Sequence, residues 1–212
     1  MRLLNCFYIF FLILLVLLSF SSAGVYYVAT WGNNASAGTV DAPWRNIQYA
    51  LNNLSEGNNT IYVENGTYAQ NVTIRLNNTV LTSNSSTRPI LTGSKIVVVH
   101  TLQNITVSSF ELTNFSANAS LTETGVPGIV TYASTNGPYS LGPVRFSNLF
   151  IHDALGSGSD VSCIYIRNAR RVVIENSIFS NCSNSGISVA SGFSTDNTYG
   201  NGIIIRNNTI YN

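Results

Sequence analysis

The sequence has few charged residues. Only 9% of its 212 residues are charged, ten Lys and Arg stand against nine Asp and Glu, and Lys95 is the single lysine. The formal net charge of +1 argues against a nucleic-acid-binding protein, because such proteins neutralise phosphates with many basic side chains. A charge-driven disordered chain is also excluded, since 45% of the residues are hydrophobic. The length suits one domain with a substantial core.

Cysteine is scarce as well, with only Cys6, Cys163 and Cys182. Neither of the last two belongs to a Cys-x-x-Cys pair, which argues against a two-cysteine metal site. A disulfide requires Cα atoms within about 7 Å of each other, and the sequence does not show that distance. Two separate thiols are therefore the preferred interpretation of Cys163 and Cys182, with a bridge as the alternative.

Only one run is long and apolar enough to approach a membrane span, and it lies at the N-terminus. Arg2 precedes the apolar run 7–18, and residues 21–23 (Ser-Ser-Ala) supply small residues for cleavage. This pattern predicts a secretory signal peptide over residues 1–23, with a signal anchor as the alternative. After cleavage we expect a secreted or cell-surface protein without a membrane span.

Neutral polar residues are abundant, with 27 Asn and 26 Ser. They create many Asn-x-Ser/Thr sequons, which predict a glycoprotein in a glycosylating host. The alternative is that a chain so rich in Asn, Ser and Thr produces the motif by chance. The sequons begin at Asn34, Asn53, Asn58, Asn65, Asn71, Asn77, Asn84, Asn104, Asn114, Asn118, Asn181 and Asn207.

A ten-residue pattern repeats along the chain. Its first, third and eighth positions are apolar, its fifth is Ser or Asn, and its tenth is usually Asn or Asp. A period of tens of residues is typical of a solenoid. The windows are 61–70, 105–114, 144–153, 172–181 and 203–212, and their starts are 44, 39, 28 and 31 residues apart.

The repeat predicts a right-handed parallel β-helix. Each window alternates apolar and polar residues as a strand does, and Asn suits a sharp corner because it tolerates left-handed backbone. Successive coils stack at about 4.8 Å, so repeated like charges would repel while stacked Asn side chains can form amide ladders. Asn65, Ser109, Asn148, Asn176 and Asn207 occupy the fifth position. Further strands are expected at 96–99, 128–132, 164–166 and 187–189.

One amphipathic helix is predicted ahead of the repeats. Residues 45–54 carry Ile47, Leu51 and Leu54 on one face, which Trp44 just before them extends, and Pro43 lies at the start. A helix in this place covers the open first coil, because a terminal repeat needs a cap.

A family resemblance is carried by residues 25–70. Tyr26-Tyr27-Val28, Ala42-Pro43-Trp44 and Gly66-Thr67-Tyr68 resemble the N-terminal module of secreted β-helix proteins of the pectin-lyase-like superfamily. We therefore expect a signal peptide (1–23), a cap with its helix (24–58) and β-helix coils (59–212). The pattern stops at Asn212 without a closing segment, which predicts a fragment or part of an assembly. The module is specific for fold but only weakly specific for function.

The resemblance implies association with a polysaccharide, which is acidic in the lyases of this superfamily. In those enzymes Asp and Glu hold Ca²⁺ and a Lys or Arg abstracts a proton, so Ca²⁺ is the expected cofactor. The best local set places metal ligands at Asp153 and Asp160 and catalytic residues at Arg167 and Arg170. The competing interpretation is structural: Asp153 replaces a corner Asn, Asp160 begins a turn, and the arginines are solvated.

Tyrosines and Arg171 complete the candidate site. Arg171 is expected to bind a carboxylated sugar, and Tyr132, Tyr139 and Tyr199 to stack on sugar rings. Their alternative is packing of loops against the coil. Glu175 is predicted to be solvated. Two functions remain open: a pectate-lyase-like β-elimination enzyme and a non-catalytic adhesin or structural surface protein. The oligomeric state stays unassigned.

Overall fold

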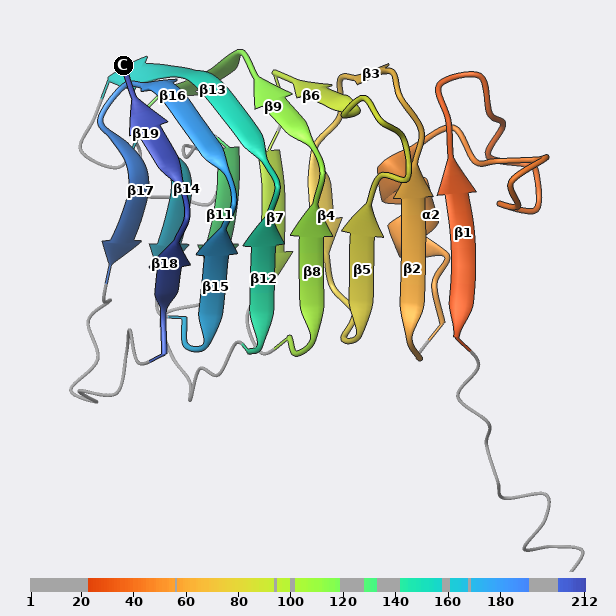
Figure 1. The fold of residues 1–212 in the computed structure, drawn as a ribbon. Helices are drawn as coiled ribbons and strands as arrows, with labels where there is room; N and C mark the ends of the chain where they lie inside the picture. The colour runs from red at the N-terminus through yellow and green to blue at the C-terminus, as the bar shows by residue number, and fades with distance from the viewer. Residues whose placement is uncertain are drawn as a thin grey trace, which may run out of the picture.

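The computed structural model describes residues 23–55, 57–93, 95–99, 102–118, 128–132, 142–157, 161–167, 169–190 and 202–212. Its strands form three parallel sheets that wind around one core, which confirms the predicted parallel β-helix. In Figure 1 the strands of one sheet rise at the front, the chain crosses to the back and descends there, and the axis advances from right to left. This winding is right-handed.

Sheet A opens each coil, sheet B follows and sheet C closes it. Sheet A contains β1 (Gly24–Val28), β2 (Asn59–Val63), β5 (Thr79–Thr82), β8 (Ile105–Ser108), β12 (Val144–Ser147), β15 (Val172–Glu175) and β18 (Ile204–Arg206). Sheet B contains β3 (Thr67–Tyr68), β6 (Ile90–Thr92), β9 (Glu111–Thr113), β13 (Phe150–Ser157), β16 (Ile178–Cys182) and β19 (Thr209–Tyr211), and β10 (Phe115–Asn118) pairs with β13. Sheet C contains β4 (Val72–Ile74), β7 (Lys95–Val99), β11 (Gly128–Tyr132), β14 (Ser162–Arg167) and β17 (Ser185–Ala190).

The core is a set of stacked apolar rows. In sheet A, Leu81 pairs with Val107, Val107 with Phe146, and Phe146 with Ile174, and all four side chains are fully buried. Each such burial contributes about 1.5–3 kcal/mol to folding. Because side chains alternate across a strand, the residues between these positions point outward and form the surface of the sheet.

Left-handed backbone at the corners confirms most of the predicted Asn turns. Between sheets A and B the residue is the fifth of each window, whereas the tenth makes a second corner within sheet B, inside β13 and β16 and between β9 and β10. Asn and Asp tolerate this conformation better than most residues. The residues and their φ angles are Ser109 (65°), Asn148 (53°), Asn176 (53°) and Asn207 (54°) at the first corner, and Asn114 (57°), Asp153 (55°) and Asn181 (48°) at the second.

The placement of Asn65 at this corner was wrong. Ile61 pairs with Leu81, and Leu81 pairs with Val107, which is the third residue of its window. The first window is therefore offset by two residues from the others. The positive φ falls instead on Gly66, at 155°, where a residue without a Cβ is suited to the conformation.

The cap helix is present but shorter than predicted. Helix α2 (Ile47–Asn52) buries Ile47, Ala50 and Leu51, as the amphipathic pattern indicated. It begins only after Asn46, whose backbone is extended (φ −113°, ψ 132°), and the Asn34 side chain accepts hydrogen bonds from the backbone N–H groups of Arg45 (3.0 Å) and Asn46 (3.1 Å). No helix among the described residues is both long and apolar enough to cross a membrane.

The helix also satisfies the first edge of sheet C. Gln48 Oε1 accepts a hydrogen bond from the N–H of Thr73 at 2.6 Å, and Gln48 Nε2 donates to the Thr73 carbonyl at 3.3 Å. Thr73 lies in β4, the first strand of sheet C. The side-chain amide thus bonds this edge as a neighbouring strand would, which protects a strand edge that could otherwise pair with another chain.

A disulfide joins two neighbouring coils. Cys163 in β14 and Cys182 in β16 are bonded, with a Cα–Cα distance of 5.6 Å. Both residues are buried. The preferred interpretation as separate thiols was therefore wrong, because winding brings together two residues that lie 19 positions apart in the sequence.

Candidate functional site

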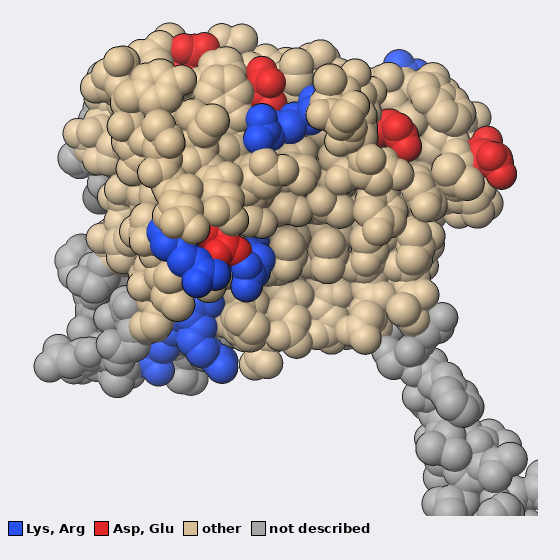
Figure 2. Space-filling model, viewed as in Figure 1, with Lys and Arg blue, Asp and Glu red and all other residues tan. Residues whose placement is uncertain are grey.

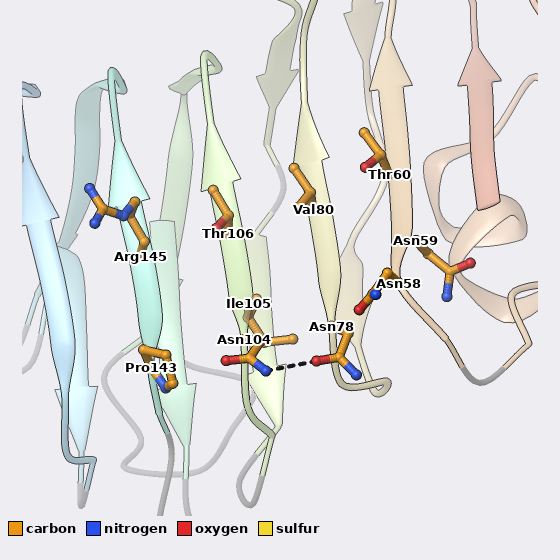
Figure 3. A pocket seen from close by; sticks show the side chains of 10 residues that line it. All are labelled: Asn58, Asn59, Thr60, Asn78, Val80, Asn104, Ile105, Thr106, Pro143 and Arg145. Atoms are coloured by element: carbon orange, nitrogen blue, oxygen red, sulfur yellow. Dashed lines mark hydrogen bonds between the residues drawn. The ribbon is translucent and has the colours of Figure 1, made fainter. Parts of the chain in front are cut away.

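A groove runs across the outer face of sheet A. Its volume is about 490 Å³, and it crosses β2, β5, β8 and β12 near their amino ends (Figure 3). Thr60, Val80, Thr106 and Arg145 are neighbours in the register, so one outward side chain from each coil lines the groove. A polymer lying across the strands would therefore meet a new side chain at about every 4.8 Å.

Asparagines form the lower wall of the groove. Asn58, Asn78 and Asn104 precede β2, β5 and β8, and Asn104 Nδ2 donates to Asn78 Oδ1 at 2.8 Å (Figure 3). Amides and hydroxyls both donate and accept hydrogen bonds, as the hydroxyl groups of a sugar do. Neutral sugar units are accordingly the chemistry that this part of the groove suits.

Arg145 connects the groove to a buried acidic group. Glu175 pairs with Arg145 on one side and with Arg206 on the other, where Arg206 Nε donates to Oε2 at 2.7 Å. The Glu175 side chain is only 6% exposed, whereas those of the two arginines are about half exposed. The prediction that Glu175 is solvated was wrong: two guanidinium groups from the adjacent coils cover it.

Basic side chains gather on this end of the sheet A face, around one acidic group (Figure 2). Arg170 and Arg171 lie in the turn before β15, and Arg171 has left-handed backbone with a φ of 52°. A Cβ built on Gly142, before β12, would lie 3.0 Å from Arg171 Nε. We call Arg145, Arg171 and Arg206 the arginine patch. With Glu175, these four residues carry a net charge of +2.

Several of the sequence-predicted site residues meet at the carboxyl edge of sheet C. Thr131 pairs with Ile166, so the following residues, Tyr132 and Arg167, are neighbours across β11 and β14. Arg170 and Arg171 continue from the end of β14. The Tyr132 side chain, Tyr139 and Tyr199 lie outside the described residues. Their predicted roles in substrate binding, like the catalytic roles of Arg167 and Arg170, stay predictions.

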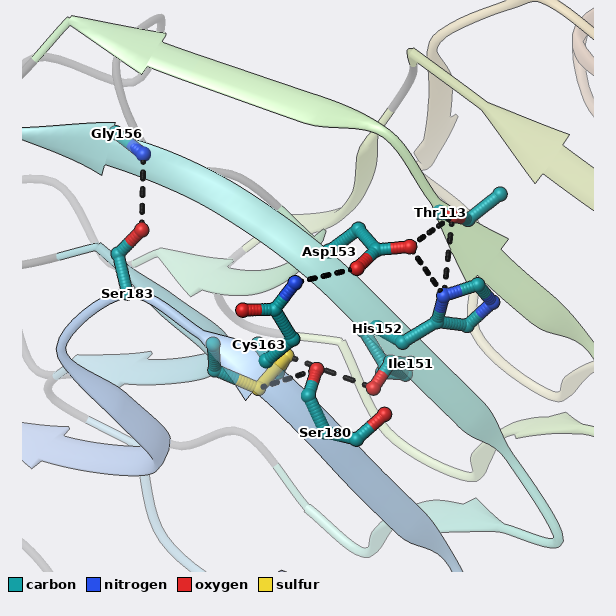
Figure 4. The surroundings of a disulfide bond; sticks show 10 residues. Thr113, Ile151, His152, Asp153, Gly156, Cys163, Ser180 and Ser183 are labelled. Carbon is teal, nitrogen blue, oxygen red and sulfur yellow. Dashed lines mark hydrogen bonds and ion pairs between the residues drawn. A yellow bond between two sulfur atoms is a disulfide. The ribbon is translucent and has the colours of Figure 1, made fainter. Parts of the chain in front are cut away.

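Asp153 belongs to a different cluster, on sheet B (Figure 4). His152 Nδ1 lies 2.7 Å from Asp153 Oδ2, and His152 Nε2 lies 3.3 Å from Glu111 Oε1. Asn181 Nδ2 donates to Asp153 Oδ1 at 2.6 Å. That hydrogen bond, the one from His152 and the nearby imidazole charge hold the pKa of Asp153 below its usual value. Glu111 and Asp153 therefore contact opposite nitrogens of the same imidazole ring.

This arrangement does not fit a calcium site among the described residues. Both oxygens of Asp153 already accept hydrogen bonds, and the described residues contain no group of three His, Cys, Asp or Glu placed to hold a metal ion. Strand β14 separates Asp153 from Arg170 and Arg171 along the coil. Asp160 lies outside the described residues, so its predicted role as a metal ligand stays a prediction.

The sequence interpretation missed the groove residues. Thr106 and Arg145 occupy the second position of their windows, between two buried apolar positions. That alternation already indicated an outward side chain, and stacking the second positions of successive windows would have found part of the row. Thr60 was hidden by the two-residue offset of the first window.

Comparison with known proteins supports the fold. No family model matches the sequence, and no curated protein matches it. Two structures of a GH136 lacto-N-biosidase from Eubacterium ramulus are similar to this chain. The native structure has a TM-score of 0.64 and 18% identity and covers 87% of this chain. The selenomethionine derivative has a TM-score of 0.63 and 17% identity and covers 88%. The chain spans 41% of that protein in both cases. A rhamnogalacturonan lyase matches with a TM-score of 0.45 and 12% identity over 89% of this chain and 68% of its own. The two biosidase structures show the β-helix fold.

Proposed function

We propose that this protein binds an acidic polysaccharide along the outer face of sheet A. The polymer crosses the strands, with neutral hydroxyls against Asn78, Asn104 and Thr106 and an anionic group against Arg145. The observation that carries the proposal is that Arg145 lines the groove and also belongs to the arginine patch. One surface therefore offers both kinds of contact.

The charge of the patch favours an anionic ligand. Glu175 uses part of the hydrogen-bonding capacity of Arg145 and Arg206, while both guanidinium groups remain about half exposed. A guanidinium group held in place loses less conformational freedom when it binds a carboxylate or sulfate. Exposed charge is screened by salt, so the affinity should fall as ionic strength rises.

Export from the cell and membership of the pectin-lyase-like superfamily are further parts of this proposal. The N-terminal apolar run and the disulfide between Cys163 and Cys182 both suit an exported protein, since disulfides persist in oxidising compartments. Residues 25–70 resemble the pectin-lyase-like module, and the similar structures include an enzyme named for lacto-N-biose, a saccharide. Both features support carbohydrate as the ligand class.

Binding without catalysis is the function that we favour. Glu175 is the only acidic residue in the groove and the patch, among the described residues, and both of its carboxylate oxygens are paired with arginines. General acid–base hydrolysis of a glycosidic bond uses two carboxyl groups. The β-elimination alternative requires residues beyond the ones that line this groove.

The test is calorimetric titration of the full chain with polygalacturonate and with its methyl-esterified form. We expect binding to the acid form and at least a roughly tenfold weaker affinity for the ester, which corresponds to about 1.4 kcal/mol. Arg145→Gln and Thr106→Trp should each weaken binding, the first by removing charge and the second by filling the groove. Arg45→Gln, a change at an exposed arginine beside the cap helix, is the matched control.

Equal affinity for the acid and ester forms would refute the anionic part of the proposal. Unchanged binding by Thr106→Trp would place the ligand on another face. Absorbance near 235 nm (a conventional wavelength for unsaturated uronate ends) distinguishes the two functions: a rise during incubation with Ca²⁺ would favour the lyase over simple binding.

A further inference from the structure

The sequons of this chain differ in whether their asparagine side chains make hydrogen bonds in the fold. An N-glycan replaces one of the two hydrogens on Asn Nδ2 and adds a sugar to that atom, so it crowds any group with which Nδ2 is in contact. Four sequon asparagines donate a hydrogen bond from that atom: Asn34 to Asn46 Oδ1 (2.7 Å), Asn53 to the Tyr49 carbonyl (2.7 Å), Asn104 to Asn78 Oδ1 (2.8 Å) and Asn181 to Asp153 Oδ1 (2.6 Å). A glycan on any of them would disturb a contact of the folded chain.

Two more sequon asparagines are held through their oxygens. Asn71 Oδ1 accepts from the N–H of Lys95 at 3.3 Å, and Asn77 Oδ1 accepts from the N–H of Gln103 at 2.7 Å. In both cases the amide links one coil to the next, so its orientation is fixed. The side chain of Asn118 lies outside the described residues.

Five sequon asparagines make no side-chain hydrogen bond within the described part of the chain, but three of them have other constraints. Asn114 and Asn207 have left-handed backbone at corners, with φ angles of 57° and 54°. Asn58 lines the groove on sheet A. The remaining two, Asn65 and Asn84, are exposed and have no positive φ.

We infer that Asn65 and Asn84 are N-glycan acceptors. Each lies in the connection that leaves sheet A, after β2 and β5 respectively, and these strands are neighbours. The hydroxyl residues of the two sequons, Thr67 and Ser86, are also exposed. Both motifs are thus presented on one edge, between sheets A and B, on adjacent coils.

The modification requires an oligosaccharide donor carried on a lipid diphosphate. The bond between sugar C1 and the diphosphate oxygen breaks, C1 bonds to Asn Nδ2, Nδ2 loses one proton and the lipid diphosphate leaves. The glycosylated amide keeps its carbonyl oxygen and one N–H. Since neither Asn65 nor Asn84 uses its amide in the fold, the product needs no rearrangement of the coils.

The two attachment points lie at the edge of sheet A opposite the asparagines of the groove. Asn65 and Asn84 follow the carboxyl ends of their strands, whereas Asn58, Asn78 and Asn104 precede the amino ends. A strand of four or five residues separates the two edges by about 15 Å. The inference does not depend on polysaccharide binding, which could fail while both sites are occupied.

The test is secretion of the full chain from yeast and mapping of its glycopeptides. Treatment with an endoglycosidase that leaves one N-acetylglucosamine on Asn marks each occupied site for mass spectrometry. We expect the mark at Asn65 and Asn84 and its absence from Asn104 and Asn181. Because the sugar itself is detected, spontaneous deamidation of Asn65-Gly66 is not mistaken for occupancy.

Thr67→Ala and Ser86→Ala provide matched controls, because each destroys one sequon without changing its asparagine. Each variant should lose one glycan by gel mobility, and the double variant should lose both. A chain without the mark at either site would overturn the inference, and an empty single site would overturn it for that residue. Occupancy of Asn104 or Asn181 in folded protein would refute the hydrogen-bond criterion itself.

Discussion

Arg206 of β18 donates from Nε to Oε2 of Glu175 in β15 at 2.7 Å, and the two residues are direct partners in the register of sheet A. Arg145 of β12 pairs with the other oxygen of Glu175. One buried carboxylate therefore joins three successive coils. Without it, the two guanidinium groups would face each other across β15 with no anion between them.

Glu175→Ala should consequently lower the free energy of unfolding by about 2 kcal/mol, since hydrogen bonds to charged groups contribute about 1.5–3 kcal/mol. Urea unfolding followed by circular dichroism measures this change. Asp41→Ala, at an exposed acidic residue near the cap, is the control and should change stability little. Equal stability of the Glu175→Ala variant and the parent would mean that the arginine pairs contribute nothing net.

The disulfide provides a second stability prediction. Its partners are 19 positions apart, and closing a loop of about that length stabilises a protein by about 3 kcal/mol through the unfolded state. The double variant Cys163→Ala, Cys182→Ala should lose about that amount in urea unfolding. Dithiothreitol should destabilise the parent similarly but leave the double variant unchanged. An effect of the reductant on the double variant would show that it acts elsewhere.

The fold was predictable because the coils of a β-helix produce a repeated pattern of apolar and corner residues in the sequence. Windows such as 144–153 and 172–181 carry the inward residues and the corner together, so alignment of the windows gives strands, turns and register at once. Asn65 shows the limit of this approach. Its window matched the pattern, yet pairing of Ile61 with Leu81 shifts it by two residues. Backbone pairing between coils, rather than composition, fixes the register.

The site was less predictable, because contacts between coils depend on which outward residues the winding brings together. Glu175 and Arg145 lie 30 positions apart, and nothing near either residue indicates a partner. The sequence correctly marked Asp153 as a corner residue but linked it to Arg170 by proximity in the chain. In the coil, β14 carries the backbone away from Asp153 before Arg170 is reached.

Substitution of Asn176 tests the requirement for left-handed backbone at a corner without the added loss of a side-chain hydrogen bond. Its φ is 53°, its side chain is exposed, and it makes no side-chain hydrogen bond among the described residues. Asn176→Ala should destabilise the protein by about 1 kcal/mol, because Ala tolerates left-handed backbone less well than Asn does. Asn176→Gly should be close to neutral. If Gly and Ala destabilise equally, loss of the amide rather than backbone strain is responsible.

The lowered pKa of Asp153 leads to a prediction of how the free energy of unfolding depends on pH. Its pKa in the folded protein is lowered, chiefly by the hydrogen bond from Asn181 and then by His152. A lowered folded pKa means that the carboxylate stabilises the fold above its unfolded pKa of about 4. The contribution is lost as the pH falls through the lower folded value, when both states become protonated. Asp153→Asn keeps a residue that tolerates left-handed backbone but removes the titration.

The urea midpoint of the parent should therefore fall more between about pH 6 and pH 3 than that of Asp153→Asn. Asp41→Asn serves as the control for a general effect of removing a carboxylate and should retain the acid sensitivity of the parent. Asn181→Ala should reduce the sensitivity partly, because it removes the main cause of the lowered pKa while leaving His152 in place. Identical acid profiles for the parent and Asp153→Asn would show that the corner carboxylate titrates alike in the folded and unfolded chains.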